Sequence, residues 1–172
     1  ICTNSNTMRI FLLGYMASGK STLGGALAEA LGVAFVDLDG LLEGLLGMPV
    51  GEYIEEKGEL SFRMAEHEAL VSWLEEGAED AVVALGGGTP VFYDHMALLN
   101  EVGRTVFLDV SIGELAQRLQ GSTDRPLIKS REDLVEFVAK HLFERRPYYS
   151  QAQVRVKGDA LGIAELRAAL EI

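Results

Sequence analysis

The sequence feature that most constrains the fold is the stretch GYMASGKS at residues 14–21, which matches the pattern G-x-x-x-x-G-K-[ST] of a phosphate-binding loop. An apolar run at 10–13 precedes it and is predicted to be a buried parallel strand; a helical pattern at 22–31 follows it and ends at Gly32. Because glycine permits turns that a side chain would block, successive backbone N–H groups can point at phosphate oxygens from the positive end of the helix dipole. The chain is therefore predicted to bind a nucleoside triphosphate.

The side chains of this loop have distinct expected roles. Lys20 would lie across the β- and γ-phosphates, and the Ser21 hydroxyl would bind Mg²⁺. The alternative is a glycine-rich turn into an ordinary helix, but such a turn has no use for glycine, lysine and serine in this order. The residues expected to contact ATP are Gly14, Ala17, Ser18, Gly19, Lys20, Ser21 and Thr22.

A single domain is expected from 172 residues, 48% of them hydrophobic, because a chain of this size can bury a core without metal or disulfide support. The net charge of −11 argues against a broad surface for nucleic acid or anionic lipid. Cys2 is the only cysteine, which suits a reducing cytoplasm, and no apolar stretch reaches about 18 residues, so no membrane span is expected. Residues 1–7 lack the features of a signal peptide and are interpreted as a disordered tail or an added remnant, with residues 8–172 as the domain.

Short apolar strands alternate with helical segments along the rest of the chain. Strands are predicted at 33–36, 81–85, 105–110 and 154–156, and helices at about 41–73, 112–119, 132–145 and from 163 onwards. This alternation is typical of an α/β fold with a central parallel sheet of about five strands and helices on both faces.

Two carboxylates, Asp37 and Asp39, follow the strand at 33–36. Ligands of open α/β sheets bind at the carboxyl ends of the strands, so both side chains are expected to face the same cleft as the phosphate-binding loop. The alternative for Asp39 is an N-cap of the helix that begins near Leu41.

Three glycines, at 86–88, follow the strand at 81–85 and open at the same end of the sheet. Glycine lowers stability through chain entropy, and it is usually found in such a position where the backbone lies close to a ligand. A plain flexible loop is the competing interpretation. Because no acidic residue ends this strand, Asp37 is the candidate carboxylate for magnesium.

A long amphipathic helix contains Arg63 beside its buried stripe, with Glu66 one turn further along. A surface salt bridge between the two is the alternative to a functional role. The three histidines, His67, His95 and His141, show no partner pattern for a metal or a catalytic triad and are interpreted as structural or exposed.

Seven of the fifteen lysines and arginines lie between Arg118 and Arg146, which marks this region for binding anions. The polar segment at about 121–131 is predicted to be a mobile lid that carries Arg125 onto the transferring phosphoryl group. The following helix is expected to end before Pro147, and its basic residues Arg145 and Arg146 could simply complement the helix dipole.

Six motifs together resemble those of the shikimate kinases, in order and in approximate spacing, over essentially the whole chain from Met8 onwards. They are the phosphate-binding loop, Asp37-x-Asp39, Phe62-Arg63 with Glu66, the glycines at 86–88, the sequence DRPL at 124–127, and Arg145-x-Pro-x-Tyr149. The resemblance implies a three-layer fold like that of nucleoside-monophosphate kinases, with a mobile lid, in a cytoplasmic and monomeric enzyme.

Shikimate kinases transfer the γ-phosphate of ATP to the 3-hydroxyl of shikimate, a step towards the aromatic amino acids. The resemblance implies that Asp39 binds the ring hydroxyls and is the base or orienting group. Arg63 and Arg145 would hold the substrate carboxylate, the backbone N–H of Gly87 would contact the substrate, and Glu66 would support the site. Which of the adjacent Arg145 and Arg146 holds the carboxylate stays open, although the spacing to Tyr149 favours Arg145.

On the nucleotide side, the resemblance implies that Arg125 lies near the transferred phosphate, that Arg118 lies over adenine, and that Asp37 is linked to Mg²⁺ through water. The segment at 156–159 matches the family poorly and suggests no adenine-binding residue. Two alternatives remain: another small-molecule kinase, acting on gluconate or a nucleoside monophosphate, and an inactive nucleotide-binding domain. The second would be expected to have lost Lys20, Asp39 or Arg125, and none is missing.

Overall fold

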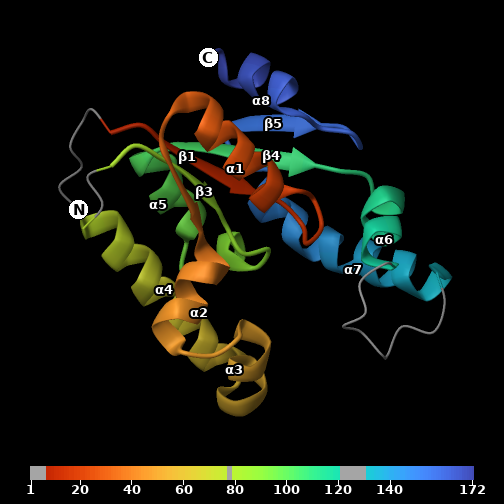
Figure 1. Ribbon diagram of the computed structural model, residues 1–172. Coiled ribbons are helices and arrows are strands. Elements are labelled where there is room, and N and C mark those ends of the chain that lie inside the picture. Colours follow the sequence, from red (N-terminus) through yellow and green to blue (C-terminus); the bar gives the residue numbers. More distant parts are fainter. Residues whose placement is uncertain (1–6, 77–78, 121–130) are drawn as a thin grey trace.

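The computed structural model describes residues 7–76, 79–120 and 131–172, and its centre is a parallel sheet (Figure 1). The strands are β1 (Arg9–Leu13), β2 (Ala34–Asp37), β3 (Ala81–Ala84), β4 (Arg104–Asp109) and β5 (Val154–Lys157). They lie in the order β2-β3-β1-β4-β5, and every neighbouring pair is parallel. All carboxyl ends therefore lie at the same edge of the sheet. Strands β2 and β3 lie on one side of β1, and the later strands β4 and β5 lie on the other.

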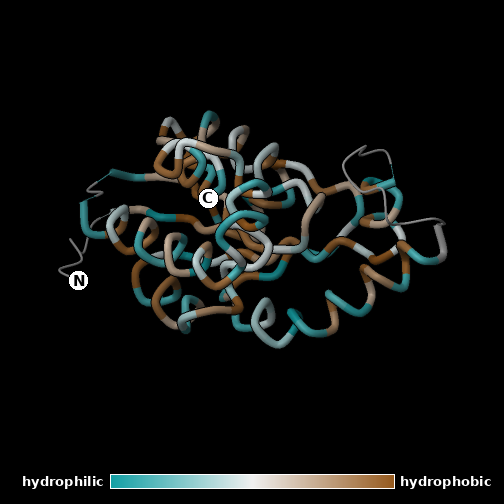
Figure 2. The backbone as a smooth tube through the Cα atoms, turned by 90° about the horizontal axis from the view of Figure 1, so that it is seen from below, coloured by the Kyte–Doolittle hydropathy of each residue, from teal (hydrophilic) through white to brown (hydrophobic). Residues whose placement is uncertain are grey.

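Helices cover both faces of the sheet, which confirms the predicted three-layer α/β fold. They are α1 (Lys20–Leu31), α2 (Leu38–Leu46), α3 (Val50–Lys57), α4 (Glu59–Glu76), the short 3-10 helix η1 (Thr89–Val91), α5 (His95–Val102), α6 (Ile112–Gln120), α7 (Arg131–Tyr149) and α8 (Ile163–Leu170). In Figure 2 hydrophobic and hydrophilic residues alternate along the turns of these helices, as expected where one face of each helix packs on the sheet.

Two hydrophobic cores arise because successive residues of a strand point to opposite faces. Ile10 and Leu12 of β1 pack with residues of α1 and α8 on one face. Phe11 and Leu13 pack on the other face with residues of α2, α4, α5, α6 and α7. All four side chains are at most 3% exposed, as predicted for a parallel strand covered on both sides.

The predicted strands all form. The helices predicted at about 41–73 begin earlier, at Leu38, and are three in number, separated near Gly47 and Gly58, where φ is 70° and 84°. Glycine adopts these left-handed values without the penalty that a Cβ would bring. Helix α5 was not predicted at all.

The prediction that the penultimate helix ends before Pro147 is wrong. Helix α7 continues to Tyr149 with Pro147 inside its last turn. Proline removes one i→i−4 hydrogen bond, yet the Ser150 N–H still donates to the Arg146 carbonyl at 2.9 Å, so the turn persists beyond the ring. The extra turn carries Tyr149 into the core, where it is 0% exposed.

No helix within the described ranges is long and apolar enough to cross a membrane. The predicted lid at about 121–131, including Arg125, falls outside the described residues except for its last position, which begins α7. Of the predicted tail, only Thr7 is described.

Candidate active site

The phosphate-binding loop joins β1 to α1 at the carboxyl edge of the sheet. Gly14 and Gly19 have φ values of 150° and 95°, and a Cβ on Gly14 would lie 2.9 Å from the Leu108 carbonyl oxygen. The Ser18 hydroxyl is buried without a hydrogen-bond partner among the described residues. A buried hydroxyl without a partner, in a loop at the N-terminus of a helix, is typical of a loop that binds an anion.

Lys20 is the first residue of α1, and its side chain folds back over the loop. Its Nζ donates to the carbonyl oxygens of Gly14 and Tyr15, at 3.0 Å each. Burial lowers the pKa of Lys20 to about 8, against the opposing effect of the carboxylates of Asp39 and Asp37. The ammonium group is therefore held at the carboxyl edge of the sheet, within the field of both carboxylates.

Asp37 ends β2 and caps α2. Its Oδ1 accepts from the backbone N–H groups of Asp39 and Gly40, at 3.1 and 3.4 Å, and its Oδ2 accepts from the Ser21 hydroxyl at 2.5 Å. The interpretation of Asp39 as the N-cap is therefore wrong, because the helix begins at Leu38 and Asp37 is the residue that precedes it. Capping by Asp37 leaves the Asp39 side chain free to point elsewhere.

Asp39 lies in the first turn of α2, open to solvent at the mouth of a cavity. Partial desolvation raises the pKa of its carboxyl group, and the nearby carboxylates of Asp37 and Glu66 raise it further, whereas Lys20 lowers it. An acidic group whose proton affinity is raised in this way is suited to accept a proton during a reaction.

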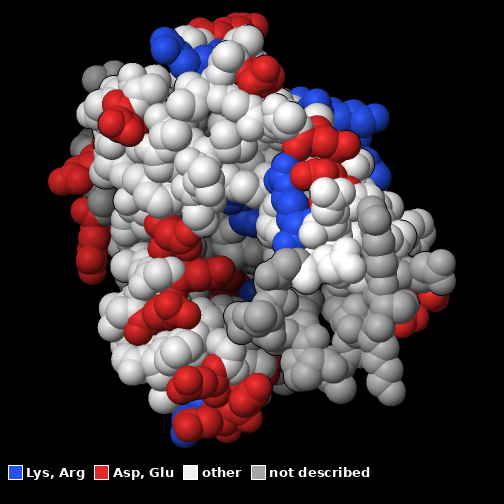
Figure 3. All heavy atoms as spheres, turned by 45° about the vertical axis from the view of Figure 1, so that its right-hand side comes forward, with Lys and Arg blue, Asp and Glu red and all other residues white. Residues whose placement is uncertain are grey.

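The cavity has a volume of about 300 Å³. It is lined by Met16, Asp39, Val50, Ile54, Phe62, Arg63, Glu66, Gly86, Gly87, Gly88 and Arg145. All five residues expected to contact or support the substrate are in this set, although they come from α2, α4, α7 and the loop at 86–88 after β3, called the glycine loop below. Figure 3 shows this side of the molecule hollowed at its centre, with Lys or Arg atoms inside the hollow and Asp and Glu along one side.

A second hollow, of about 430 Å³, lies between α2 and α4. Leucines, Trp73 and two glutamates line most of it, and none of the described lysines or arginines does. It therefore lacks the cations that an anionic substrate requires, and the smaller cavity is the better candidate for the chemistry.

Arg63 and Glu66 form a buried ion pair rather than the surface salt bridge considered from the sequence. The Arg63 Nη1 donates to the Glu66 Oε2 at 2.7 Å, and the two residues are 8% and 0% exposed. The guanidinium group lies 5.0 Å from the Phe62 ring centre and 4.7 Å from that of Phe92. Packing between two rings and a buried carboxylate fixes its direction, which matters for gripping a planar carboxylate.

Side chains of the cavity lie so close to the backbone of the glycine loop that a Cβ would not fit at two of its positions. A Cβ on Gly88 would lie 2.3 Å from the Arg63 Nη2, and a Cβ on Gly86 would lie 2.8 Å from the Asp39 Oδ1. Both distances are too short for real atoms, so side chains at these positions would displace groups of the cavity. The interpretation as a plain flexible loop is thereby corrected.

Arg145 and Arg146 point to different partners. Arg145 lines the cavity, approaches the Gly87 carbonyl at 3.5 Å and lies over the Tyr15 ring at 5.6 Å. Arg146 instead reaches the Asp109 carboxylate, at 3.2 Å. Of the two arginines, only Arg145 is directed at the cavity.

Arg118 on α6 connects three parts of the nucleotide side. It donates to the Ala17 carbonyl of the phosphate-binding loop at 3.1 Å, to the Asp159 carbonyl after β5 at 2.5 Å, and to Glu114 at 2.7 Å. The segment that matched poorly by sequence therefore meets Arg118 in space.

No group of three or more His, Cys, Asp or Glu residues that could hold a metal occurs in the described part of the chain. The oxygen pair of Ser21 and Asp37 does fit Mg²⁺, because this ion prefers hard oxygen ligands and takes only one or two from the protein, with water and phosphates completing its shell.

Three further residues shape the site without having been assigned a role from the sequence. The Tyr149 hydroxyl donates to the Gly87 carbonyl at 2.5 Å, the Thr89 hydroxyl donates to the Glu66 Oε1 at 2.5 Å, and Tyr15 faces Arg145. The only sequence signal was Tyr149, as the last residue of the Arg145-x-Pro-x-Tyr149 motif. The contacts of the other two join residues far apart in the sequence and follow no local pattern.

Comparisons with known proteins show the family of the chain. A model of the shikimate kinase family matches residues 16–168. A shikimate kinase of Bacteroides thetaiotaomicron is 43% identical over 157 residues, covering 90% of this chain and 89% of that relative. A crystal structure of shikimate kinase from the same species has a TM-score of 0.88 at 39% identity, covering 96% of this chain and 99% of that one. A shikimate kinase from Acinetobacter baumannii in complex with shikimate has a TM-score of 0.83 at 28% identity, covering 96% of this chain and 94% of that one. The chain belongs to the shikimate kinase family.

Proposed function

We propose that the chain catalyses the reaction of its family, the ATP-dependent phosphorylation of the 3-hydroxyl of shikimate to give shikimate 3-phosphate and ADP. The observation that carries the proposal is that Asp39, Arg63 and Arg145 line one cavity, and that Lys20 lies within the field of Asp39 and Arg145. Shikimate is a small polyol with one carboxylate. Arginines can grip the carboxylate in a bidentate manner, while an aspartate accepts hydrogen bonds from ring hydroxyls.

In the proposed mechanism the 3-oxygen attacks the γ-phosphorus as the bond from this phosphorus to the bridging oxygen of ADP breaks. The hydroxyl proton passes to the Asp39 carboxylate, whose raised pKa favours its acceptance late in the transfer. Lys20, together with Arg125, neutralises charge on the transferring group. Arg63 and Arg145 hold the substrate carboxylate, Glu66 holds Arg63, and the Gly87 N–H contacts the substrate.

On the nucleotide side, residues 14–22 hold the phosphates and Arg118 lies against adenine. Ser21 and, through water, Asp37 would hold Mg²⁺, which supplies positive charge that neutralises the phosphate oxygens. The Ser21–Asp37 contact supports this pair, because both oxygens already lie together at the edge of the phosphate-binding loop. We also infer a single domain that acts as a monomer in the cytoplasm, without nucleic acid or membrane partners.

The decisive experiment is an ADP-release assay with Mg-ATP and shikimate, run beside gluconate and nucleoside monophosphates. Release that requires shikimate and collapses in Asp39→Asn and Lys20→Ala supports the reaction, the acceptor and both roles. Binding of Mg-ATP without turnover of any acceptor would overturn the proposal in favour of an inactive nucleotide-binding domain. Turnover of another acceptor alone would assign a different small-molecule kinase.

Arg145→Met and Arg146→Met form a matched pair for the carboxylate site. Loss of a bidentate, charge-assisted contact should raise the KM for shikimate roughly 30-fold or more in Arg145→Met. Arg146→Met should change it by less than about twofold, since Arg146 is directed at Asp109. Equal effects in the two variants would contradict the assignment of Arg145.

A further inference from the structure

A chain of hydrogen bonds leads from Arg63 to a pair of histidines. Glu66 uses both carboxylate oxygens, accepting from Arg63 Nη1 at 2.7 Å and from the Thr89 hydroxyl at 2.5 Å. The Thr89 carbonyl oxygen lies 2.8 Å from His95 Nδ1, and His95 Nε2 lies 2.9 Å from His67 Nδ1. Thr89 is thus held at both ends, by Glu66 through its hydroxyl and by His95 through its backbone.

The partners of His95 determine where its hydrogens are. A carbonyl oxygen only accepts, so His95 Nδ1 must carry a hydrogen. Only one hydrogen fits between His95 Nε2 and His67 Nδ1, which are 2.9 Å apart. An additional proton can be taken up at His67 Nε2 without loss of either contact. A second additional proton would place hydrogens on both facing nitrogens and break the contact between the rings.

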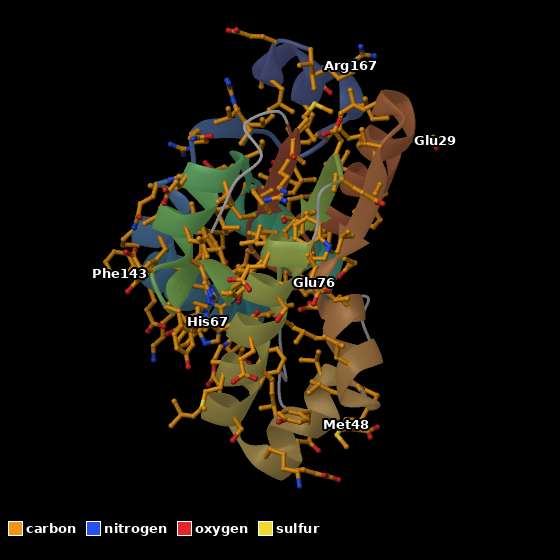
Figure 4. All side chains as sticks on the ribbon, turned by 90° about the vertical axis from the view of Figure 1, so that its left-hand side faces the viewer. Glu29, Met48, His67, Glu76, Phe143 and Arg167 are labelled. Atoms are coloured by element: carbon orange, nitrogen blue, oxygen red, sulfur yellow. The ribbon has the colours of Figure 1, made fainter. Side chains whose placement is uncertain are left out.

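A constrained turn packs against the pair. His95 and Thr89 are both 0% exposed, and the Tyr93 ring is stacked on His67 with ring centres 4.4 Å apart at an angle of 15°. Tyr93 and Asp94 both have a φ of 53°, a left-handed value that costs energy in residues other than glycine and persists only where the surroundings impose it. In Figure 4, which labels His67, its side chain lies beside the green ribbon that carries the segment after β3.

The groups around His95 have opposing effects on its pKa. Burial lowers the pKa of His95, and His67 and Arg63 lower it further, whereas the Thr89 carbonyl and the Glu66 carboxylate raise it. These groups come from α4 and from the segment between β3 and α5, and Tyr93 adds a ring 5.8 Å away. His95 is therefore best accommodated as a neutral donor to Thr89.

We propose that His95, supported by His67, is a positioning residue for the shikimate site. It holds Thr89 so that Glu66 keeps Arg63 directed into the cavity, and it does so only while the histidine pair carries no more than one positive charge. The proposal rests on the role proposed above for Arg63. Neither histidine lines the cavity, so both act through Glu66 and Arg63.

The kinetic test compares His95→Leu with His95→Asn. Leucine removes the donor to Thr89, and this should raise the KM for shikimate about fivefold to 20-fold while kcat and the KM for ATP change by less than about twofold. Asparagine places an amide N–H near the position of Nδ1 and should restore the KM to within about twofold of the wild type. Because asparagine does not titrate, kcat/KM for shikimate should also fall less steeply than in the wild type as the pH drops below 6.5, the ordinary pKa of histidine.

An unchanged KM for shikimate in folded His95→Leu, equal rises for both substrates, or no rescue by asparagine would overturn the proposal. Should His95→Leu not fold, Thr89→Val and His67→Leu carry the same test, since each breaks one link of the chain, and unchanged KM values there would overturn it equally. Arg63→Met separates this inference from the proposed function. An unchanged KM in that variant would overturn the role of Arg63 and the inference with it, whereas unchanged KM values in the histidine and threonine variants alone overturn only the inference.

A direct readout does not depend on activity. Long-range ¹H–¹⁵N NMR correlations of the histidine rings should identify His95 as the neutral Nδ1–H tautomer near pH 7, in the free protein. The Nε2–H tautomer, or a freely titrating imidazole at this position, would overturn the proposal, because His95 would then not donate to Thr89.

Discussion

At the scale of single residues, the charged groups of the site lower the stability of the folded protein. Asp39 keeps a raised pKa because partial desolvation and the neighbouring carboxylates of Asp37, Glu66 and Glu43 disfavour its charge. Lys20 keeps a lowered pKa because its ammonium group is partly withdrawn from water. The charged form of each residue is less stable in the folded protein than it would be in water. A ligand that supplies an opposite charge or a hydrogen-bond partner would stabilise it.

Asp39→Asn should abolish most activity and stabilise the protein. The native state binds more protons than the unfolded state between the ordinary pKa of 3.8 and the raised pKa of Asp39, so this group lowers stability as pH rises through that window. Asparagine removes this effect. We expect kcat to fall by about 10²-fold to 10⁴-fold and Tm to rise at pH 7, with no gain in Tm below pH 3.8. Thermal unfolding at several pH values tests this, and a lower Tm for the variant at pH 7 would contradict it.

Binding of Mg-ATP should be accompanied by proton uptake at Lys20. In the free protein this group loses its proton near pH 8, whereas phosphates favour the charged ammonium. Calorimetric titration in buffers of different ionisation enthalpy should therefore show uptake by Lys20 that is small at pH 6.5 and reaches about half a proton at pH 8.

Lys20→Arg is the control for this uptake, because arginine stays charged throughout this range. Subtracting its titration removes the contribution of the nucleotide itself. Equal uptake in the wild type and in Lys20→Arg at pH 8 would show that Lys20 is already fully protonated there and would contradict the lowered pKa.

At the scale of elements, the glycine loop after β3 and the last turn of α7 form one wall of the cavity. Tyr149 fixes the Gly87 carbonyl, and Arg145 approaches the same oxygen. This wall depends on the extension of α7 past Pro147, which local sequence rules did not predict. Burial raises the pKa of Tyr149 to about 12, so its hydroxyl remains a donor to this loop across the working range of pH.

Gly88→Ala should damage the shikimate site specifically. Its φ of −96° is open to alanine, but the new Cβ would lie 2.3 Å from the Arg63 Nη2, so Arg63 or the loop must move. We expect the KM for shikimate to rise about tenfold, with a much smaller change in the KM for ATP.

Gly44→Ala in α2 is the matched control, because no described atom beyond its chain neighbours and the backbone of its own helix lies within 4 Å of its Cβ position. That variant should keep its kinetics and gain a little stability, since alanine is the better helix former. If Gly88→Ala retained the wild-type KM for shikimate, the close approach of Arg63 to this loop would not occur in solution.

At the scale of the whole molecule, the parallel sheet explains why residues from distant parts of the chain meet. The carboxyl ends of β1, β2 and β3 bring the phosphate-binding loop, the Asp37–Asp39 pair and the glycine loop to one edge. On the other side of β1, Asp109 at the end of β4 joins Arg155 of β5 to Arg146 of α7. This cluster ties the edge strand β5 to the helix that carries Arg145.

Asp109→Asn should lower stability without a direct effect on the cavity. Asp109 is 5% exposed and accepts from both arginines, so loss of its charge weakens two charge-assisted contacts. Because both arginine side chains are about half exposed, we expect a loss of about 1–2 kcal/mol and a fall in Tm of about 2–6 °C. Glu101→Gln on the exposed face of α5 is the control, and equal Tm values for the two variants would show that the cluster contributes no stability.

The sequence by itself determined the fold class, the phosphate-binding loop and the family, because these depend on local patterns: alternation of strands and helices, glycines at fixed spacing, and short motifs in order. It also determined which residue types reach the cavity. Only the tertiary structure decided that Asp37 rather than Asp39 caps α2, that the Arg63–Glu66 pair is buried, that Arg145 rather than Arg146 faces the cavity, and that His67 meets His95. Each of these depends on what another element places beside the residue, through burial, close approach or a partner far away in the sequence, and no local pattern carries that information.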